Sequence, residues 1–181
     1  MKLKKFLEEH NIEAMLISSK YSLRYFTGFT GTTGIALAFA EKRFFFTDFR
    51  YVTQAKKEVE PNGFTVVKVE RGAVDALAEY IKNSGIKKLG IEDKYVTLAE
   101  YVVYKEKFEG IGFVTLGEAL DKLRMIKTEE EIGYIKKAVE IGDKVFEYIL
   151  DKVKEGAIEK DLAAEMEFQM KKLGGEGPSF E

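Results

Sequence analysis

The sequence contains no cysteine and no tryptophan, and only one histidine and two prolines among its 181 residues. Without cysteine the segment has no disulfide framework, no thiolate nucleophile and no cysteine-ligated zinc site. This composition suits a reducing compartment, and we expect a cytoplasmic protein. The single histidine, His10, falls where the first expected helix ends, a position typical of a surface residue.

The sequence also lacks a large excess of charge of one sign, and it lacks long apolar runs. The net charge is −2, with 29 basic and 31 acidic residues interleaved along the chain. No basic stripe is present, which argues against a nucleic-acid partner. The longest apolar run, Ile35 to Ala40, is too short to cross a bilayer, and the charged start lacks the apolar region of a signal peptide. We expect no membrane partner.

Over about the first 120 residues, short β-like runs alternate with amphipathic helical stretches. Asp48 is expected to cap the helix that follows it, and Thr97 with Glu100 forms a capping box. The alternation predicts an α/β fold, a mixed β-sheet flanked by helices on both faces. The expected strands are Ala14–Ile17, Ile35–Phe39, Arg43–Thr47, Thr65–Val69, Leu89–Ile91 and Gly112–Thr115.

The pattern changes after about Leu123. A second capping box, Thr128 with Glu131, opens a long amphipathic helix whose apolar face reaches Val153 and which Gly156 is expected to end. A further helix, with apolar residues from Leu162 to Leu173, follows with no strand between. We therefore expect one domain over 1–122 and the start of another over 123–181. So short a segment does not readily build its own core, so we expect it to be truncated.

Four segments carry a family resemblance. Y-F-T-G-F-T-G-T-T-G at 25–34 and F-F-T-D-F-R-Y at 45–51 resemble two motifs of the creatinase/prolidase N-terminal domain. L-R-M-I-K-T-E-E-E-I at 123–132, and the stretch from Gly156 to Phe180, resemble the opening of the pita-bread catalytic domain. Their order along nearly the whole chain is that of Xaa-Pro dipeptidases (prolidases) and aminopeptidases P. The resemblance implies a creatinase-type domain followed by two long helices that open an α+β pita-bread domain.

This resemblance also implies an activity and its cofactors. Such enzymes hydrolyse the bond between an N-terminal residue and proline with two divalent metal ions, Mn, Co or Zn. Their two Asp, one His and two Glu ligands would all lie beyond the stretch that ends here at Phe180. The resemblance therefore assigns no catalytic residue and no metal ligand to these residues, and we expect the chain alone to be inactive.

In similar enzymes the N-terminal domain helps to form a homodimer, and one loop reaches over the partner's active site to limit substrate length. The matching loop here gives four candidate substrate-proximal residues, and its glycines suggest mobility. A phosphate cradle is disfavoured, because no Lys-Ser/Thr follows the glycines and the next expected element is a strand. Arg50 is expected to pair with a nearby carboxylate or carbonyl. The four candidates are Phe29, Thr30, Gly31 and Thr32.

Two other interpretations remain open. One is a non-catalytic creatinase-like module that binds peptides or proteins, as in some histone-chaperone subunits, although no acidic tail or long insertion points to chromatin. The other is creatinase itself, which shares the fold without the metal. A downstream reading frame with the five metal ligands would favour the peptidase, and one without them the binding module.

Overall fold

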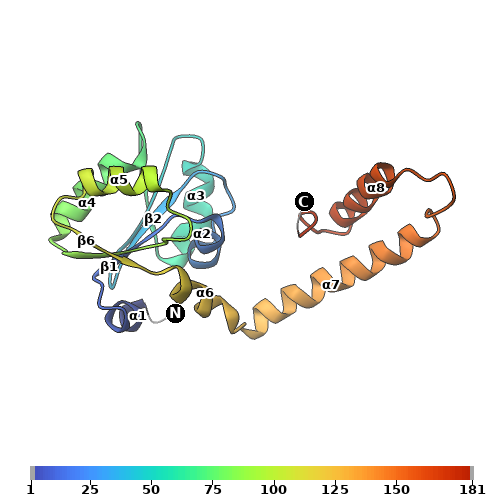
Figure 1. Ribbon diagram of the computed structural model, residues 1–181, viewed down its shortest axis with the longest axis horizontal. Coiled ribbons are helices and arrows are strands. Elements are labelled where there is room, and N and C mark those ends of the chain that lie inside the picture. Colours follow the sequence, from blue (N-terminus) through green and yellow to red (C-terminus); the bar gives the residue numbers. More distant parts are fainter. Residues whose placement is uncertain (1–2, 180–181) are drawn as a thin grey trace. The chain divides into compact units, whose positions relative to one another are not determined.

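The computed structural model describes residues 3–179 and divides into two compact units, a front unit of residues 1–123 and a rear unit of residues 124–181 (Figure 1). Phe180, the end of the last motif, lies outside the described residues. None of the helices in the described part of the chain combines the length and apolar character needed to cross a bilayer.

The front unit is built on one six-stranded sheet in the order β4-β3-β2-β1-β5-β6. β1 pairs antiparallel with β2, and β2 with β3, while the β1–β5, β5–β6 and β3–β4 pairs are parallel. The predicted mixed sheet is therefore confirmed. The strands are β1 (Ala14–Ile17), β2 (Ile35–Phe39), β3 (Arg43–Thr47), β4 (Thr65–Lys68), β5 (Lys88–Ile91) and β6 (Gly112–Thr115).

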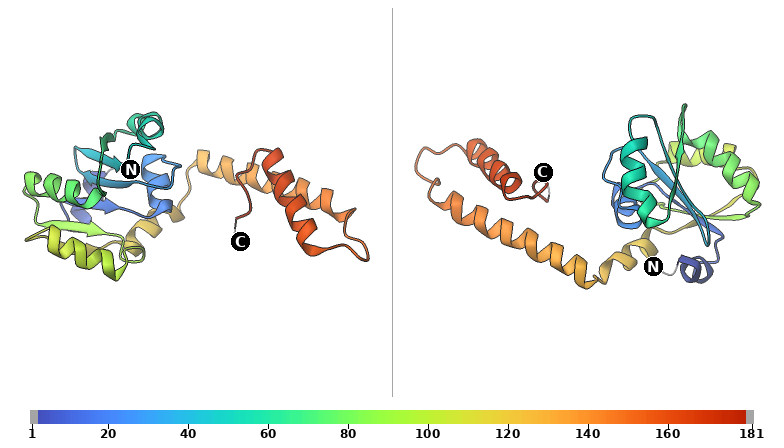
Figure 2. Two further views of the ribbon diagram at one scale, coloured as in Figure 1. Left: turned by 90° about the horizontal axis from the view of Figure 1, so that it is seen from above. Right: turned by 180° about the vertical axis from the view of Figure 1, so that it is seen from behind.

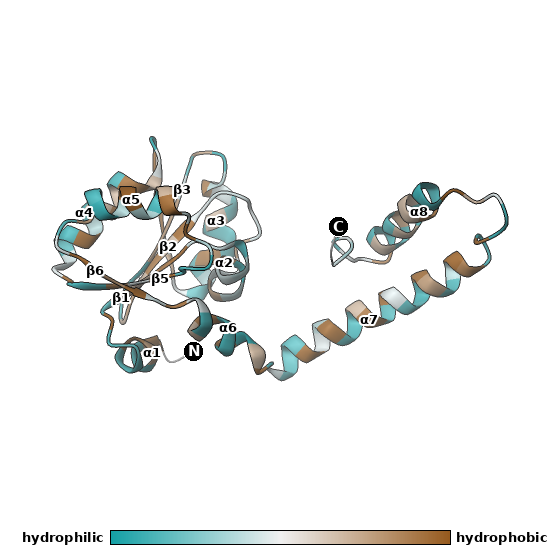
Figure 3. Ribbon diagram, viewed as in Figure 1, coloured by the Kyte–Doolittle hydropathy of each residue, from teal (hydrophilic) through white to brown (hydrophobic). Residues whose placement is uncertain are grey.

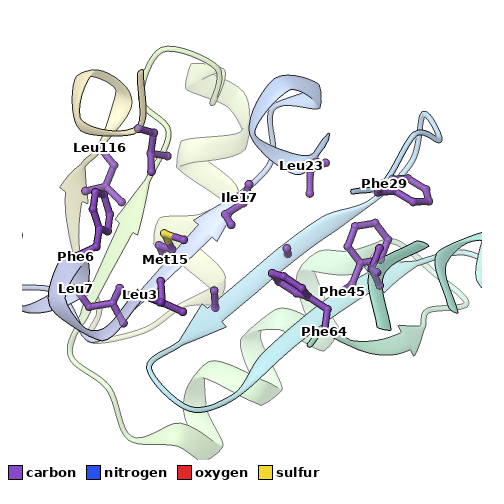
Figure 4. Close-up of a cluster of buried hydrophobic side chains, with 14 of the residues drawn as sticks. Leu3, Phe6, Leu7, Met15, Ile17, Leu23, Phe29, Phe45, Phe64 and Leu116 are labelled. Atoms are coloured by element: carbon purple, nitrogen blue, oxygen red, sulfur yellow. The ribbon is translucent and has the colours of Figure 1, made fainter. Parts of the chain in front are cut away.

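Helices cover both faces of this sheet, so successive residues of the central strand β1 are all buried. Met15 and Ile17 face one apolar cluster, drawn in Figure 4, and Ala14 and Leu16 face the other. The first cluster takes side chains from α1, α2, α3 and α6, and the second from α4 and α5. These helices are α1 (Leu3–Glu9), α2 (Lys20–Thr27), α3 (Val52–Val59), α4 (Ala73–Ser84), α5 (Leu98–Lys107) and α6 (Gly117–Met125).

Two of these helices, α2 and α6, were not predicted from the sequence. Helix α2 begins at the N-cap Ser19, whose hydroxyl accepts from Ser22 N. The buried carboxylate of Glu92 stabilises this start by accepting hydrogen bonds from Ser18 N (2.6 Å), Ser19 N (2.9 Å) and Ser19 Oγ (2.8 Å). The Ser19 cap is local, but Glu92 is 73 residues away, so local sequence patterns could not reveal the support that its carboxylate gives.

The prediction that Asp48 caps the following helix is wrong. Helix α3 begins at Val52, its N-cap is Tyr51, and no side chain caps it. A turn intervenes: Tyr51 N donates to Asp48 O, and Asp48 Oδ1 accepts from Arg50 N at 2.9 Å. The side chain of Asp48 therefore orders the turn before the helix and not the helix itself.

The rear unit consists of α7 (Glu129–Leu150) and α8 (Glu159–Lys172), which folds back toward α7 (Figure 2). The capping box of Thr128 and Glu131 is confirmed. Gly156 does not end α7, which stops at Leu150. It instead takes a left-handed conformation (φ 84°) in a turn that Ala157 N closes on Lys154 O.

Candidate functional site

The candidate loop joins α2 to β2 and packs against the corner between β3 and α3. Helix α2 ends at Gly28, which has a left-handed conformation (φ 76°) and donates its N–H to Arg24 O. From there the chain turns back into the sheet at Ile35. The loop, residues 28–34, and the corner, residues 48–51, come together although they are separated in the sequence. We call this pair of segments the loop–corner platform.

The four candidate residues do not share one environment. Phe29 is 2% exposed, and its ring lies 4.6 Å from that of Phe45 and 5.8 Å from that of Tyr51. Figure 4 shows it directed into the buried cluster beside Phe45. The expectation that Phe29 contacts a ligand does not fit this burial. Phe29 instead anchors the loop.

The glycines of the loop allow close packing and do not suggest mobility. A Cβ atom on Gly31 would lie 2.4 Å from the ring of Phe29 and 2.8 Å from that of Tyr51. On Gly34 it would lie 2.3 Å from the ring of Phe45. All three distances are shorter than carbon atoms in contact tolerate, so the aromatic neighbours of Gly31 and Gly34 leave no room for a side chain at either position.

Thr30 is held by the side chains of α3. Its backbone N–H and its hydroxyl both donate to the carboxylate of Glu58, at 2.9 and 2.8 Å. Gln54 Nε2 donates to the Thr30 hydroxyl at 2.9 Å and to Glu58 at 3.1 Å. Burial favours a higher pKa for Glu58, but these hydrogen bonds together outweigh it and hold the pKa below its ordinary value. The sequence analysis did not identify Glu58, although its i,i+4 spacing from Gln54 marks one helix face.

Thr32 connects the loop to the corner through a hydrogen bond between its hydroxyl and Tyr51 Oη, 2.6 Å apart. At the corner the predicted partner of Arg50 is confirmed. Its guanidinium binds both oxygens of Asp48, at 3.0 and 2.7 Å, and this hydrogen bonding lowers the pKa of Asp48 and raises that of Arg50. Between these two residues, Phe49 projects outward with 74% of its surface exposed. The platform is therefore rigid, held by aromatic packing as well as by hydrogen bonds, and it carries one exposed aromatic side chain.

The hydrogen bonds of this platform link its side chains to one another and to α3. Thr30 donates to Glu58 of α3, Thr32 bonds Tyr51, and Arg50 donates to Asp48. Across residues 3–179, no group of three or more His, Cys, Asp or Glu side chains is placed to hold a metal ion. These residues therefore do not fit a dinuclear metal centre. His10 lies in another part of the front unit, where its ring packs against Phe6 with centroids 4.2 Å apart.

Comparison with known proteins supports, in both units, the family resemblance found in the sequence motifs. Residues 1–126 match the creatinase/prolidase N-terminal domain, and residues 133–181 match metallopeptidase family M24. The uncharacterized peptidase YqhT of Bacillus subtilis is 37% identical and the Xaa-Pro dipeptidase of Pyrococcus furiosus 34% identical, each match covering 99% of this chain and 50% of the relative.

Solved structures agree with the sequence relatives. An Xaa-Pro dipeptidase from Bacillus anthracis superposes with a TM-score of 0.90 at 36% identity, covering 99% of this chain and 50% of that one. The chain thus spans about half the length of the relatives it matches. The chain belongs to the creatinase/prolidase N-terminal domain family and continues into the beginning of an M24 metallopeptidase domain.

Proposed function

We propose that this chain is the amino-terminal part of a metal-dependent peptidase that hydrolyses the bond between an N-terminal residue and proline. The strongest support is sequence identity over nearly the whole chain. It is 34% to the Xaa-Pro dipeptidase of Pyrococcus furiosus and 36% to that of Bacillus anthracis. In this proposal 1–122 is the N-terminal domain, and 123–181 opens a catalytic domain whose remainder supplies the ligands for two divalent ions, Mn, Co or Zn. The enzyme would act in the cytoplasm.

The test uses the product of the complete reading frame that contains these residues. We expect it to release proline from Xaa-Pro dipeptides in the presence of Mn²⁺ or Co²⁺, and a chelator to abolish the release. Residues 1–181 alone are expected to show no metal-dependent release. A complete product that binds peptides without cleaving them would instead support the binding-module interpretation.

We further propose that the enzyme is a homodimer in which the loop–corner platform of one subunit limits substrate length at the active site of the other. The accessible candidates are Thr30, Gly31 and Thr32 of the loop, together with Phe49 of the corner, since Phe29 is buried. The rigidity of the platform supports this role, because a stop for the substrate must hold its position.

Alanine substitutions in the complete enzyme test the platform. Phe49→Ala and Thr30→Ala should change the preference for dipeptides over tripeptides, while kcat for the preferred dipeptide is largely kept. Thr65→Ala, at an exposed position of β4, is a matched control and should leave the preference unaltered. If both platform variants show the same length preference as the parent enzyme, the proposed role is wrong.

A further inference from the structure

The turn that follows α3 contains an Asn-Gly pair. The chain has three asparagines, and only Asn62 is followed by glycine. Asparagine is a thermolabile residue, because the backbone nitrogen of the next residue can attack its side-chain amide carbon. Glycine hinders this attack least, since it has no side chain. The pair lies at the end of the short 3-10 helix η1 (Glu60–Asn62), and residues 60–63 are all exposed to water. Figure 3 shows hydrophilic residues along α3, which leads into this turn.

The side chain of Asn62 ties two helices together. Its Nδ2 donates to Thr27 O at 3.0 Å and to Glu58 O at 3.1 Å. Thr27 is the last residue of α2, and Glu58 lies in the last turn of α3, where backbone carbonyls lack a partner within the helix. A Cβ atom on Gly28 would lie 2.9 Å from Asn62 Nδ2, so this amide packs directly against the first residue of the loop–corner platform.

The folded turn also engages both groups that would react. Gly63 N, the attacking nitrogen, donates to Glu60 O at 2.9 Å, while Asn62 Nδ2, the leaving group, makes the two bonds described above. The turn is anchored on its far side by Phe64, which is 4% exposed and donates its N–H to Val59 O at 3.2 Å. The attack therefore requires the turn to open locally.

We propose that Asn62–Gly63 is a site of spontaneous deamidation, which the folded turn suppresses and whose product unties α2 from α3. In the first step Gly63 N loses its proton and bonds to Asn62 Cγ, the Cγ–Nδ2 bond breaks, and ammonia leaves with that proton. Water then adds to either carbonyl of the resulting cyclic imide and opens it, which gives aspartate or isoaspartate. Water is the only co-reactant.

The product cannot replace the bonds that are lost. The amide of Asn62 donates through its NH₂ group, whereas a carboxylate only accepts hydrogen bonds. At this position the carboxylate would face two other acceptors, Thr27 O and Glu58 O. Both bonds are then lost, and the oxygens repel one another. The modification therefore acts on the point where α2 passes into the loop–corner platform.

Peptide mapping by mass spectrometry tests the site and its protection. The chain is incubated folded, and unfolded in urea, at the same temperature and pH, and conversion is measured at all three asparagines. In urea, Asn62 should convert faster than Asn11 and Asn83. Folding should slow conversion at Asn62 by about tenfold or more, because the reaction waits for local opening. Equal rates in the two states, or faster conversion of another asparagine in urea, overturn the proposal.

Two substitutions test the effect of the product. Asn62→Asp mimics the aspartate product, and Asn62→Ala removes the donor without adding a charge. Asn62→Asp should lower the melting temperature of the front unit by about 5 °C, and by more than Asn62→Ala does, because only the carboxylate repels the two carbonyls. Asn83→Asp, at an exposed position of α4, is the matched control and should lower it less.

An Asn62→Asp chain as stable as the parent chain or as Asn62→Ala contradicts the proposed untying of α2 from α3. Neither measurement uses proline release, so failure of this proposal leaves the proposed peptidase activity unaffected.

Discussion

In the front unit, Phe45 and Phe46 of β3 have no exposed surface, whereas in the rear unit Phe146 of α7 is 60% exposed and Phe168 of α8 is similarly exposed. The difference follows from architecture. A sheet covered by helices on both faces has two apolar clusters, but two helices can cover only one side of each other. Of the described residues of the rear unit, only Val145 and Ile149 are buried hydrophobics. The comparison shows that an amphipathic sequence pattern can specify a helix without specifying a core that buries its apolar face.

The largest effect is expected from removing one buried ring. Phe45→Ala removes a side chain that packs with Phe29 and borders Gly34, and should lower the free energy of unfolding of the front unit by about 3–5 kcal/mol. Urea unfolding followed by circular dichroism measures this change. Phe146→Ala in the rear unit is the matched control, and its effect should stay within about 0.5 kcal/mol. Similar losses in both variants would mean that α7 is covered in solution.

A smaller effect is expected from adding one methyl group to a glycine. Gly34→Ala forces a Cβ against the ring of Phe45 and should destabilise the front unit by about 1–3 kcal/mol. Gly133→Ala on α7, where a Cβ meets no atom within 4 Å, should instead stabilise its helix by about 0.5–1 kcal/mol. In thermal melting, Gly34→Ala should lower the melting temperature and Gly133→Ala should raise it. If Gly34→Ala leaves the stability unchanged, the loop must shift to accommodate the added methyl group.

The smallest effect is expected from removing a hydrogen bond at the surface between α7 and α8. Tyr148 Oη donates to Glu165 at 2.6 Å, and this bond, with that from Gln169, holds the pKa of Glu165 below its ordinary value. A carboxyl whose pKa is lower in the folded state stabilises the fold above its unfolded pKa, and the contribution is lost as pH falls through the folded pKa. Tyr148→Phe should therefore raise the pKa of Glu165 toward its ordinary value, which a pH titration by NMR would measure. Glu58 of the front unit, held by Thr30, should titrate as before.

Much of the fold could be predicted because its signals are local. All six strands were predicted to within a residue at each end, and both capping boxes formed where Thr and Glu stand three residues apart. The prediction failed where local signals compete or are absent. Asp48 has the residue type of a cap, but Arg50 engages its carboxylate in a turn, and the start of α2 is also held by the distant Glu92.

The candidate site was predicted in part for the same reason. The motif at 25–34 located the loop, and the pairing of Arg50 followed from residue type alone. The burial of Phe29, the contact of Thr32 with Tyr51 and the role of Glu58 all depend on segments distant in sequence coming together. Phe49, the most exposed aromatic of the platform, has no sequence signal that distinguishes it from its buried neighbours Phe45 and Phe46.

The sequence by itself determined the strand and helix pattern, the family and the lack of a histidine-rich site, because these rest on residue types and their local spacing. Only the tertiary structure decided which phenylalanines are anchors and which are exposed, why Gly31 and Gly34 must be glycine, and that Asn62 ties α2 to α3. Burial and close contact are properties of segments brought together in space, and no local pattern encodes them.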